Sequence, residues 1–285
     1  MPPHTNFRSL LHEAAGSLFG VIFPTRCSLC NSEVANAGGL GVCAACWSRV
    51  EAWDGISCER CGLPIVSERA TDAAQVLCEP CRVNEPSFDS ARGYGIYREN
   101  LRLLVLQLKF GRRERLGRRL GALLAQAWGK LDGTGDGEAL LIVPVPLFSS
   151  RERERGFNQA RLLAQGLKAR FGKLPEKMNA KIETGVLVRT RPTLPQAGLK
   201  FQARQENVRG AFAVVNPERV RGRSILLVDD VMTTGATLSA CAAALKKGGA
   251  ARVYGLALAR ATPQFPDMEN LPLPSGVDEF RHDWT

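Results

Sequence analysis

Histidine is scarce in this chain of 285 residues, which has only His4, His12 and His282, all close to its two ends. A histidine-based catalytic triad in the middle of the chain is therefore excluded. The sequence also lacks an H-E-x-x-H motif, a Walker A lysine and a G-x-G-x-x-G dinucleotide pattern. These absences argue against zinc proteases, P-loop nucleotide hydrolases and dinucleotide-dependent dehydrogenases.

Long apolar runs are missing as well. The longest nearly uncharged stretches fall far short of the ~20 apolar residues that a membrane helix needs. The beginning of the chain has no basic segment followed by an apolar segment and a small-residue cleavage site, as an export signal would. Apolar residues between Leu10 and Ile22 instead recur at helical spacing, which predicts an amphipathic leader helix over residues 1–26. We therefore expect a soluble, cytoplasmic protein without a membrane span.

Aromatic residues are also few, at 7% of the chain, so binding of single-stranded nucleic acid mainly by stacking is poorly supported. The formal net charge is +10, and it is unevenly distributed. Residues 27–86 contain four basic and eight acidic residues, whereas residues 87–261 contain 31 basic and 14 acidic residues. A positive field attracts the phosphates of nucleotides, pyrophosphate, nucleic acid or lipid, without choosing among them.

Paired cysteines, by contrast, are abundant. Eight of the nine cysteines form four C-x-x-C pairs, and Cys241 stands apart in an alanine-rich run. Two thiolates on one tight turn chelate an ion, and two such turns complete a tetrahedral site that suits Zn²⁺. Disulfides would require an oxidising compartment, and iron–sulfur ligation is a third interpretation that also uses four cysteines. We predict two structural Cys₄ zinc sites, with Cys27, Cys30, Cys43, Cys46, Cys58, Cys61, Cys78 and Cys81 as ligands.

The pairing of the four C-x-x-C turns decides the shape of this module. If neighbouring pairs share an ion, residues 27–86 form two zinc ribbons in tandem, and if alternate pairs share an ion they form a cross-brace. We favour sequential pairing, because each loop is then short and closes at a lower cost in entropy. The module is poor in apolar residues and should depend on metal to fold. We expect loss of a ligand to unfold residues 27–86 and to spare the rest.

Short apolar stretches alternate with helix-like stretches in residues 87–261. This alternation is typical of an α/β domain, with a parallel sheet covered by helices on both faces and ligands bound at the carboxyl ends of its strands. The proline-rich, acidic residues 262–285 predict a flexible tail. We expect strands at residues 140–145, 186–188, 211–215, 225–228 and 253–258, and helices at residues 100–110, 158–171 and 237–247.

The chemistry is concentrated in residues 225–238, which read ILLVDDVMTTGATL. An apolar strand ends at two carboxylates, and a loop of small residues then opens a helix. Backbone N–H groups and the helix dipole at such a loop bind phosphate, threonine hydroxyls add donors, and adjacent carboxylates accept hydrogen bonds from neighbouring hydroxyls. The stretch therefore predicts a site for a ribose 5-phosphate formed by Asp229, Asp230, Thr233, Thr234, Gly235, Ala236 and Thr237.

A second strand that leads into a loop lies in residues 142–158, which read IVPVPLFSSRERERGFN. A pyrophosphate leaving group needs cationic and backbone contacts, and this loop is rich in arginine. A solvated loop with surface arginines is the alternative. The stretch resembles the pyrophosphate loop of type I phosphoribosyltransferases, and this resemblance implies contacts from Arg151, Arg155, Gly156, Phe157 and Asn158.

Residues 225–238 resemble the phosphoribosyl pyrophosphate (PRPP) loop of type I phosphoribosyltransferases over 14 consecutive positions, and the second stretch resembles the pyrophosphate loop of those enzymes. A narrower subfamily of these enzymes is also resembled at Leu108-Lys109-Phe110-Gly111 and Arg189-Thr190. With four C-x-x-C pairs in front, residues 10–260 resemble the ComF/GntX-like family, bacterial proteins associated with natural competence and the use of external DNA.

The resemblance implies a double zinc ribbon over residues 27–86, joined to a phosphoribosyltransferase domain over residues 87–261 with a hood at about 87–130. It also implies that PRPP binds together with Mg²⁺. In that case Asp229 and Asp230 hold the ribose hydroxyls, residues 233–237 hold the 5-phosphate, and Arg155 takes a catalytic position beside the two acids.

Two functions follow from the resemblance. One is an enzyme that transfers phosphoribosyl from PRPP to an acceptor, chiefly by positioning and by electrostatic stabilisation of the leaving group. The other is a non-catalytic factor that senses PRPP or handles DNA, with single-stranded DNA or DNA-uptake proteins as partners. The arginine cluster between residues 112 and 119 motivates this second function, although a solvated helix face explains the cluster equally well. A third, weaker interpretation makes the ribbons a docking module for DNA-uptake proteins. The sequence carries no signal for the acceptor or the oligomeric state.

Overall fold

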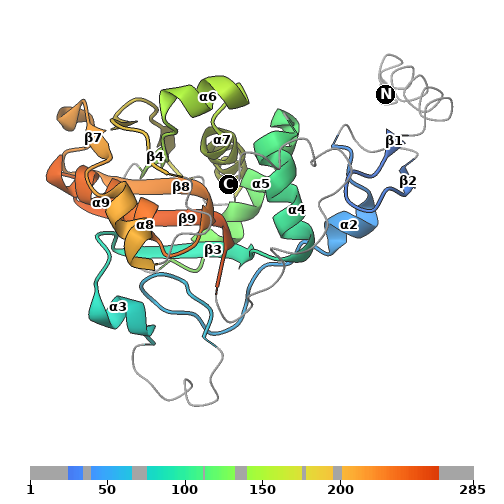
Figure 1. The fold of residues 1–285 in the computed structure, drawn as a ribbon, viewed down its shortest axis with the longest axis horizontal. Coiled ribbons are helices and arrows are strands. Elements are labelled where there is room, and N and C mark those ends of the chain that lie inside the picture. The colour runs from blue at the N-terminus through green and yellow to red at the C-terminus, as the bar shows by residue number, and fades with distance from the viewer. Residues whose placement is uncertain are drawn as a thin grey trace, which may run out of the picture.

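The computed structural model describes residues 25–34, 40–65, 76–111, 113–131, 140–174, 178–194 and 201–262. For residues 201 and 202 it describes the backbone alone. The predicted leader helix and tail fall almost wholly outside these ranges. Figure 1 shows a central sheet with helices on both faces and the cysteine-rich segments at its margin.

Five parallel strands form the central sheet, in the order β3-β9-β8-β4-β5. The apolar strands β4 (Leu140–Pro144), β8 (Ser224–Met232) and β9 (Arg252–Arg260) were predictable from the sequence, and they confirm the α/β fold class. β3 (Ser90–Ile96) and β5 (Ala180–Ile182) have no such signal, because arginine and glycine interrupt the first and lysine interrupts the second. β3 lies within the segment expected to form a hood, and it is an edge strand of the sheet.

Two predicted strands lie outside the parallel sheet, contrary to expectation. β6 (Leu187–Arg189) and β7 (Phe212–Val214) pair with each other in antiparallel fashion and form a separate two-stranded sheet. Each has three residues, of which only the first is buried. The β6–β7 pair therefore packs only one apolar face, against α9 (Ala236–Lys247). A strand of the parallel sheet would instead be buried on both faces.

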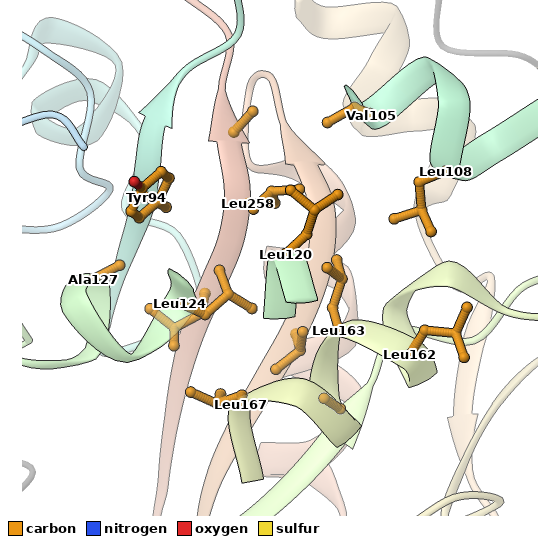
Figure 2. Close-up of a cluster of buried hydrophobic side chains, with 14 of the residues drawn as sticks. Tyr94, Val105, Leu108, Leu120, Leu124, Ala127, Leu162, Leu163, Leu167 and Leu258 are labelled. Carbon is orange, nitrogen blue, oxygen red and sulfur yellow. The ribbon is translucent and has the colours of Figure 1, made fainter. Parts of the chain in front are cut away.

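The alternation of side chains along β8 explains why helices cover both faces of the sheet. Leu226 and Val228 belong to the core cluster beneath α5 (Glu114–Trp128) and α7 (Gln159–Phe171), whereas Ile225 and Leu227 belong to the cluster beneath α9. Figure 2 shows the first cluster, in which leucines of α5 and α7 meet over β9. The predicted helices at residues 100–110, 158–171 and 237–247 are confirmed as α4 (Glu99–Phe110), α7 and α9.

The remaining elements are short, apart from the eight-residue helix α8 (Phe201–Val208). Among the described residues, no helix has the length and apolar character needed to cross a membrane. The short elements are β1 (Thr25–Arg26), β2 (Glu33–Val34), α2 (Ala44–Ser48), α3 (Glu79–Val83), α6 (Ser149–Arg155) and the 3₁₀ helix η2 (Pro217–Arg219).

Candidate functional site

The eight paired cysteines form two clusters of four, and the sequential pairing predicted from loop length is confirmed. Within each cluster, the Sγ atoms all lie within 4.8 Å of one another. Four sulfurs bound tetrahedrally at a Zn–S distance of about 2.3 Å would be about 3.8 Å apart, and one Sγ pair in each cluster is 3.6 Å apart. Both sets therefore fit a zinc ion. The first cluster is Cys27, Cys30, Cys43 and Cys46, and the second is Cys58, Cys61, Cys78 and Cys81.

The local sequence builds both clusters in the same way. The first C-x-x-C of each cluster is followed by a residue with a left-handed φ, Asn31 at 60° and Gly62 at 63°. The second C-x-x-C of each begins a short helix, with Cys43 as the N-cap of α2 and Cys78 as the N-cap of α3. The clusters differ in burial, because Cys30 in the first is exposed, whereas no cysteine of the second is.

Asp229 and Asp230 lie where β8 extends beyond its neighbour β4. Pairing with β4 ends at Val228, whereas pairing with β9 continues to Met232. The two acids therefore lie inside a strand longer than predicted, at an edge that β4 leaves open. Asp230 is 5% exposed and Asp229 is half-buried. The N–H of Asp230 donates to Oδ1 of Asp229 at 2.8 Å, so the two carboxyl groups are held close together.

A lysine from another element faces this acidic pair. Nζ of Lys109, in the last turn of α4, lies 3.3 Å from Oδ2 of Asp230. Burial and the negative charge of Asp230 raise the pKa of Asp229 to about 7, although Lys109 and Arg189 act in the opposite direction. Asp229 therefore exchanges its proton near neutral pH, as groups at functional sites often do.

The loop after β8 has the predicted strand-to-helix context. Thr233 and Thr234 lead to Gly235, whose φ of 81° is in the left-handed region that favours glycine, and α9 begins at Ala236. Oγ1 of Thr234 accepts a hydrogen bond from the N–H of Ala236 at 3.3 Å. The first turn of a helix leaves backbone N–H groups without partners inside the helix. The loop and this helix end, including Thr237, therefore form a cradle with donors suited to a phosphate.

The arginine-rich stretch after β4 is a helix, not the predicted loop. α6 consists of good helix formers after two serines, and Gly156 ends it with a left-handed φ of 79°. Arg151 and Arg155 are four residues apart, lie on the same side of this helix, and both line the cleft described below. The guanidinium carbon of Arg155 is 5.6 Å from the ring centre of Phe110, and burial lowers the pKa of this arginine.

The other three residues of the predicted pyrophosphate loop are less available to a ligand. Gly156 and Phe157 are not among the described residues that line the cleft, and Phe157 packs against the core. Asn158 does line the cleft, but both ends of its amide are engaged. Its Oδ1 accepts from the N–H of Ala160 at 2.9 Å, and its Nδ2 donates to the carbonyl of Val145 at 3.0 Å. Asn158 therefore fastens the end of β4 to the start of α7.

A cleft of about 1410 Å³ brings these parts together. Its wall contains residues of α4, α6, the end of β6, α8 and the second cysteine cluster, and also the loop of residues 233–237, which we name the phosphate loop. Small-molecule sites typically have about 300–1,000 Å³, so the cleft has room for more than one ligand. The cationic side chains of the wall are Arg102, Lys109, Arg151, Arg155, Arg189, Arg204, Arg209 and Arg260.

Only Arg151 and Arg155 of these eight cations were among the predicted site residues, and three of the other six interact with the two acids or with the loop after β8: Lys109, Arg189 and Arg260. Lys109 and Arg189 belong to segments that fit the family pattern, which was the only sequence signal for them. Arg260 is the last residue of β9 and had no signal, because it reads as the end of an apolar strand. Arg189 has a buried Nε without a hydrogen-bond partner, and burial lowers its pKa.

Comparison with known proteins finds two family models that match this chain. Residues 18–83 match the double zinc ribbon domain, and residues 160–267 match the phosphoribosyl transferase domain. The DNA utilization protein YhgH of Escherichia coli O157:H7 is 34% identical over 238 residues, which cover 83% of this chain and 97% of that protein. Competence protein F of Haemophilus influenzae is 33% identical over 243 residues, which cover 84% and 98%. Competence protein ComFC of Bacillus subtilis is 24% identical over 267 residues, which cover 88% and 99%.

Proposed function

The chain belongs to the ComF/GntX-like family, in which a double zinc ribbon precedes a phosphoribosyltransferase domain, and we propose that it binds PRPP and transfers the phosphoribosyl group to an acceptor. The main support is the open edge of β8, where Asp229 and Asp230 adjoin the phosphate cradle of residues 233–237. Two carboxylates beside a phosphate cradle match a ribose with free hydroxyls and a 5-phosphate. The names of the relatives, DNA utilization protein and competence protein, support a link between the proposed activity and competence or the use of DNA.

In this proposal each wall of the cleft has its own part in the reaction. The carboxylates of Asp229 and Asp230 accept hydrogen bonds from the ribose hydroxyls, and the cradle holds the 5-phosphate. Arg151 and Arg155 face the pyrophosphate and stabilise the negative charge that develops as its bond to C1 breaks. The acceptor then forms a new bond to C1, and pyrophosphate leaves. Asp229 and Asp230 offer the hard oxygen atoms that suit Mg²⁺, which would neutralise pyrophosphate charge while held mainly by PRPP oxygens and water.

The two cysteine clusters have a structural part in this proposal. Each offers four sulfur ligands to one ion, a closed set that leaves no position for a substrate. Thiolates persist in a reducing compartment, so we place the protein in the cytoplasm.

A PRPP-sensing or DNA-handling factor is the second candidate function. Exposed arginines along α5 favour it, because a row of cations attracts a nucleic-acid backbone. Two of these arginines are also tied to neighbours. Nε of Arg118 donates to Oε1 of Gln165 at 3.3 Å, and the guanidinium carbon of Arg119 lies 4.5 Å from the ring centre of Trp47. The row therefore has a structural role as well, which weakens this candidate.

Pyrophosphate release distinguishes the two functions. The zinc-loaded protein is incubated with Mg²⁺–PRPP and a panel of nucleobases, amines and single-stranded DNA. We expect release that depends on an acceptor and is lost when Asp229 and Asp230 are both changed to Asn, which would also identify the acceptor class. PRPP binding without release, together with an affinity for single-stranded DNA that falls steeply with salt, would favour the second function.

The affinity for PRPP should rise with pH through neutrality. Ionised Asp229 accepts hydrogen bonds with both oxygens, and its pKa is raised to about 7. We therefore expect a gain of about tenfold between about pH 6 and about pH 8, measured by isothermal titration. Asp229→Asn should bind more weakly and keep only the pH dependence that comes from the phosphates of PRPP. Identical pH profiles for the two proteins would contradict this role of Asp229.

Folding stability should have the opposite pH dependence. Because the folded-state pKa of Asp229 is raised, its stabilising contribution is fully present below the unfolded value of 3.8 and is lost as the pH rises through about 7. Bound PRPP, which favours the ionised form, offsets this loss.

A further inference from the structure

Arg260 is a cation buried between the second cysteine cluster and the phosphate loop. Its side chain is 4% exposed. Nη1 donates to the carbonyl oxygens of Met232 at 2.9 Å and Ala261 at 3.0 Å, and also to that of Thr233. Nη2 lies 3.7 Å from Sγ of Cys61. One guanidinium group thus contacts a cysteine of the second cluster on one side and the backbone that opens the phosphate loop on the other.

The second cluster, once loaded with metal, would place a negative charge beside Arg260. None of the ion pairs between described residues includes Arg260. A buried arginine without an opposite charge is unfavourable. Zn²⁺ with four thiolate ligands carries a net negative charge, and hydrogen bonds to metal ligands from surrounding groups are a regular feature of such sites. The metal-loaded second cluster is therefore the counter-charge for Arg260.

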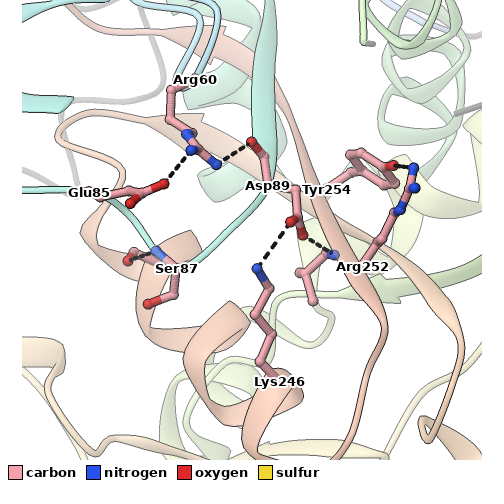
Figure 3. A network of polar contacts seen from close by, with 9 residues as sticks. Arg60, Glu85, Ser87, Asp89, Lys246, Arg252 and Tyr254 are labelled. Carbon is pink, nitrogen blue, oxygen red and sulfur yellow. Dashed lines mark hydrogen bonds and ion pairs between the residues drawn. The ribbon is translucent and has the colours of Figure 1, made fainter. Parts of the chain in front are cut away.

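Further contacts fix the second cluster to the strand beside the loop. Arg60, between two of the cysteines, donates to the carbonyl of Asp89 at 2.9 Å and forms an ion pair with Glu85 (Figure 3). The N–H of Ala91 in β3 donates to the carbonyl of Arg60 at 2.9 Å. Three cysteines of this cluster also share a core with Phe88, Met232 and Ala236. The second ribbon and the phosphate loop therefore form one packed unit.

The first cluster has different neighbours. The carbonyl of Cys46 accepts a hydrogen bond from Nδ2 of Asn100, in α4, at 2.8 Å, and the adjacent Trp47 stacks with Arg119 of α5. None of its cysteines lines the cleft, whereas Cys61, Cys78 and Cys81 of the second cluster do. The first cluster is thus a metal site that does not line the cleft, and it provides a control within the same chain.

We propose that Arg260 is a positioning residue that couples metal binding at the second cluster to PRPP binding at the phosphate loop. With metal bound, the thiolate of Cys61 holds the guanidinium group, which in turn holds the carbonyls of Met232 and Thr233 and sets the loop. Without metal, Arg260 loses its counter-charge and the loop loses this support. The inference rests on the proposed binding of PRPP and requires no turnover.

Two substitutions of Arg260 test the coupling. Arg260→Met keeps the apolar stem and removes the charge, whereas Arg260→Lys keeps the charge and removes the planar fork. We expect Arg260→Met to lower PRPP affinity by about 5- to 150-fold while both zinc ions are retained, as measured by titration and metal analysis of one sample. Arg260→Lys should recover part of the affinity. Cys30→Ser is the matched control, because it should lose the zinc of the first cluster without a change in PRPP affinity.

A reciprocal measurement does not depend on the folding of an Arg260 variant. Coupling between two binding sites acts equally in both directions. Saturating PRPP should therefore raise the zinc affinity of the second cluster by the factor by which zinc at that cluster raises the affinity for PRPP. Competition with a chelator measures this zinc affinity in the Cys30→Ser protein, which holds only the zinc ion of the second cluster. Zinc affinity that PRPP leaves unchanged, or native PRPP affinity in Arg260→Met, would overturn the coupling alone. A native protein that does not bind PRPP would overturn the proposed function and the coupling together.

Discussion

Changing Asp229 and Asp230 together to Asn should abolish PRPP binding and leave the fold in place. Each carboxylate offers charge-assisted hydrogen bonds to ribose hydroxyls, and such a bond contributes about 1.5–3 kcal/mol. Loss of both should weaken binding by a factor on the order of 100 or more. Asparagine keeps the shape of both side chains, so the phosphate cradle is unchanged. Isothermal titration with Mg²⁺–PRPP measures the effect.

The stability of this double variant provides its own control. Burial first, and then the negative charge of Asp230, raises the pKa of Asp229, so neutral side chains remove both unfavourable effects and offset the lost ion pair between Asp230 and Lys109. We expect a melting temperature close to, or above, that of the native protein. Asp54→Asn removes a carboxylate from an exposed loop and should leave PRPP affinity unchanged. Native affinity in the double variant would contradict the role given to the acids.

Cys58→Ser should release the zinc of the second cluster and destabilise the sheet as well as the ribbon. Cys58 is 0% exposed and shares a core with Phe88, Ile225 and Leu227. Binding of a structural zinc contributes on the order of 10 kcal/mol to folding, so its loss should lower the melting temperature by about 10 °C or more. Calorimetry and metal analysis on the same sample measure the two effects together.

Cys30→Ser provides the contrast, because Cys30 is exposed and belongs to the first cluster. We expect the loss of one zinc ion with a smaller fall in melting temperature. The sequence alone predicts that loss of a ligand unfolds the ribbons and spares the sheet. For the second cluster we expect instead that the sheet is destabilised as well, because this cluster and the sheet share a core. A Cys58→Ser protein that lacks one zinc ion and melts like the native protein would contradict this.

The two cysteine clusters and the strand-loop-helix arrangement of residues 225–238 were predictable because both are local features. A C-x-x-C turn places two ligands together whatever surrounds it, and the short loops between turns favour sequential pairing. Residues 225–238 likewise contain the strand, the acids, the loop and the helix start in one continuous stretch. The arrangement of such a stretch follows from its own backbone.

The limits of the secondary-structure elements depended on their neighbours. β8 continues past the acids because β9 pairs with it as far as Met232, which the sequence of β8 does not reveal. β6 and β7 read as apolar strands, but their pairing with each other separates them from the parallel sheet. α6 differs from the predicted loop because its residues favour a helix, although its high charge and its position after a strand are typical of a loop.

Only the tertiary structure decided which charges surround the loop. Lys109, Arg189 and Arg260 come from α4, the β6–β7 hairpin and β9, and their distances from β8 depend on how these elements pack. The motif therefore specifies the acids and the loop, while packing pairs Asp230 with Lys109 at 3.3 Å and places Arg260 between Cys61 and the loop. The physical reason is that a local pattern specifies backbone shape, whereas the electrostatic field of a site is a sum over side chains distant in sequence.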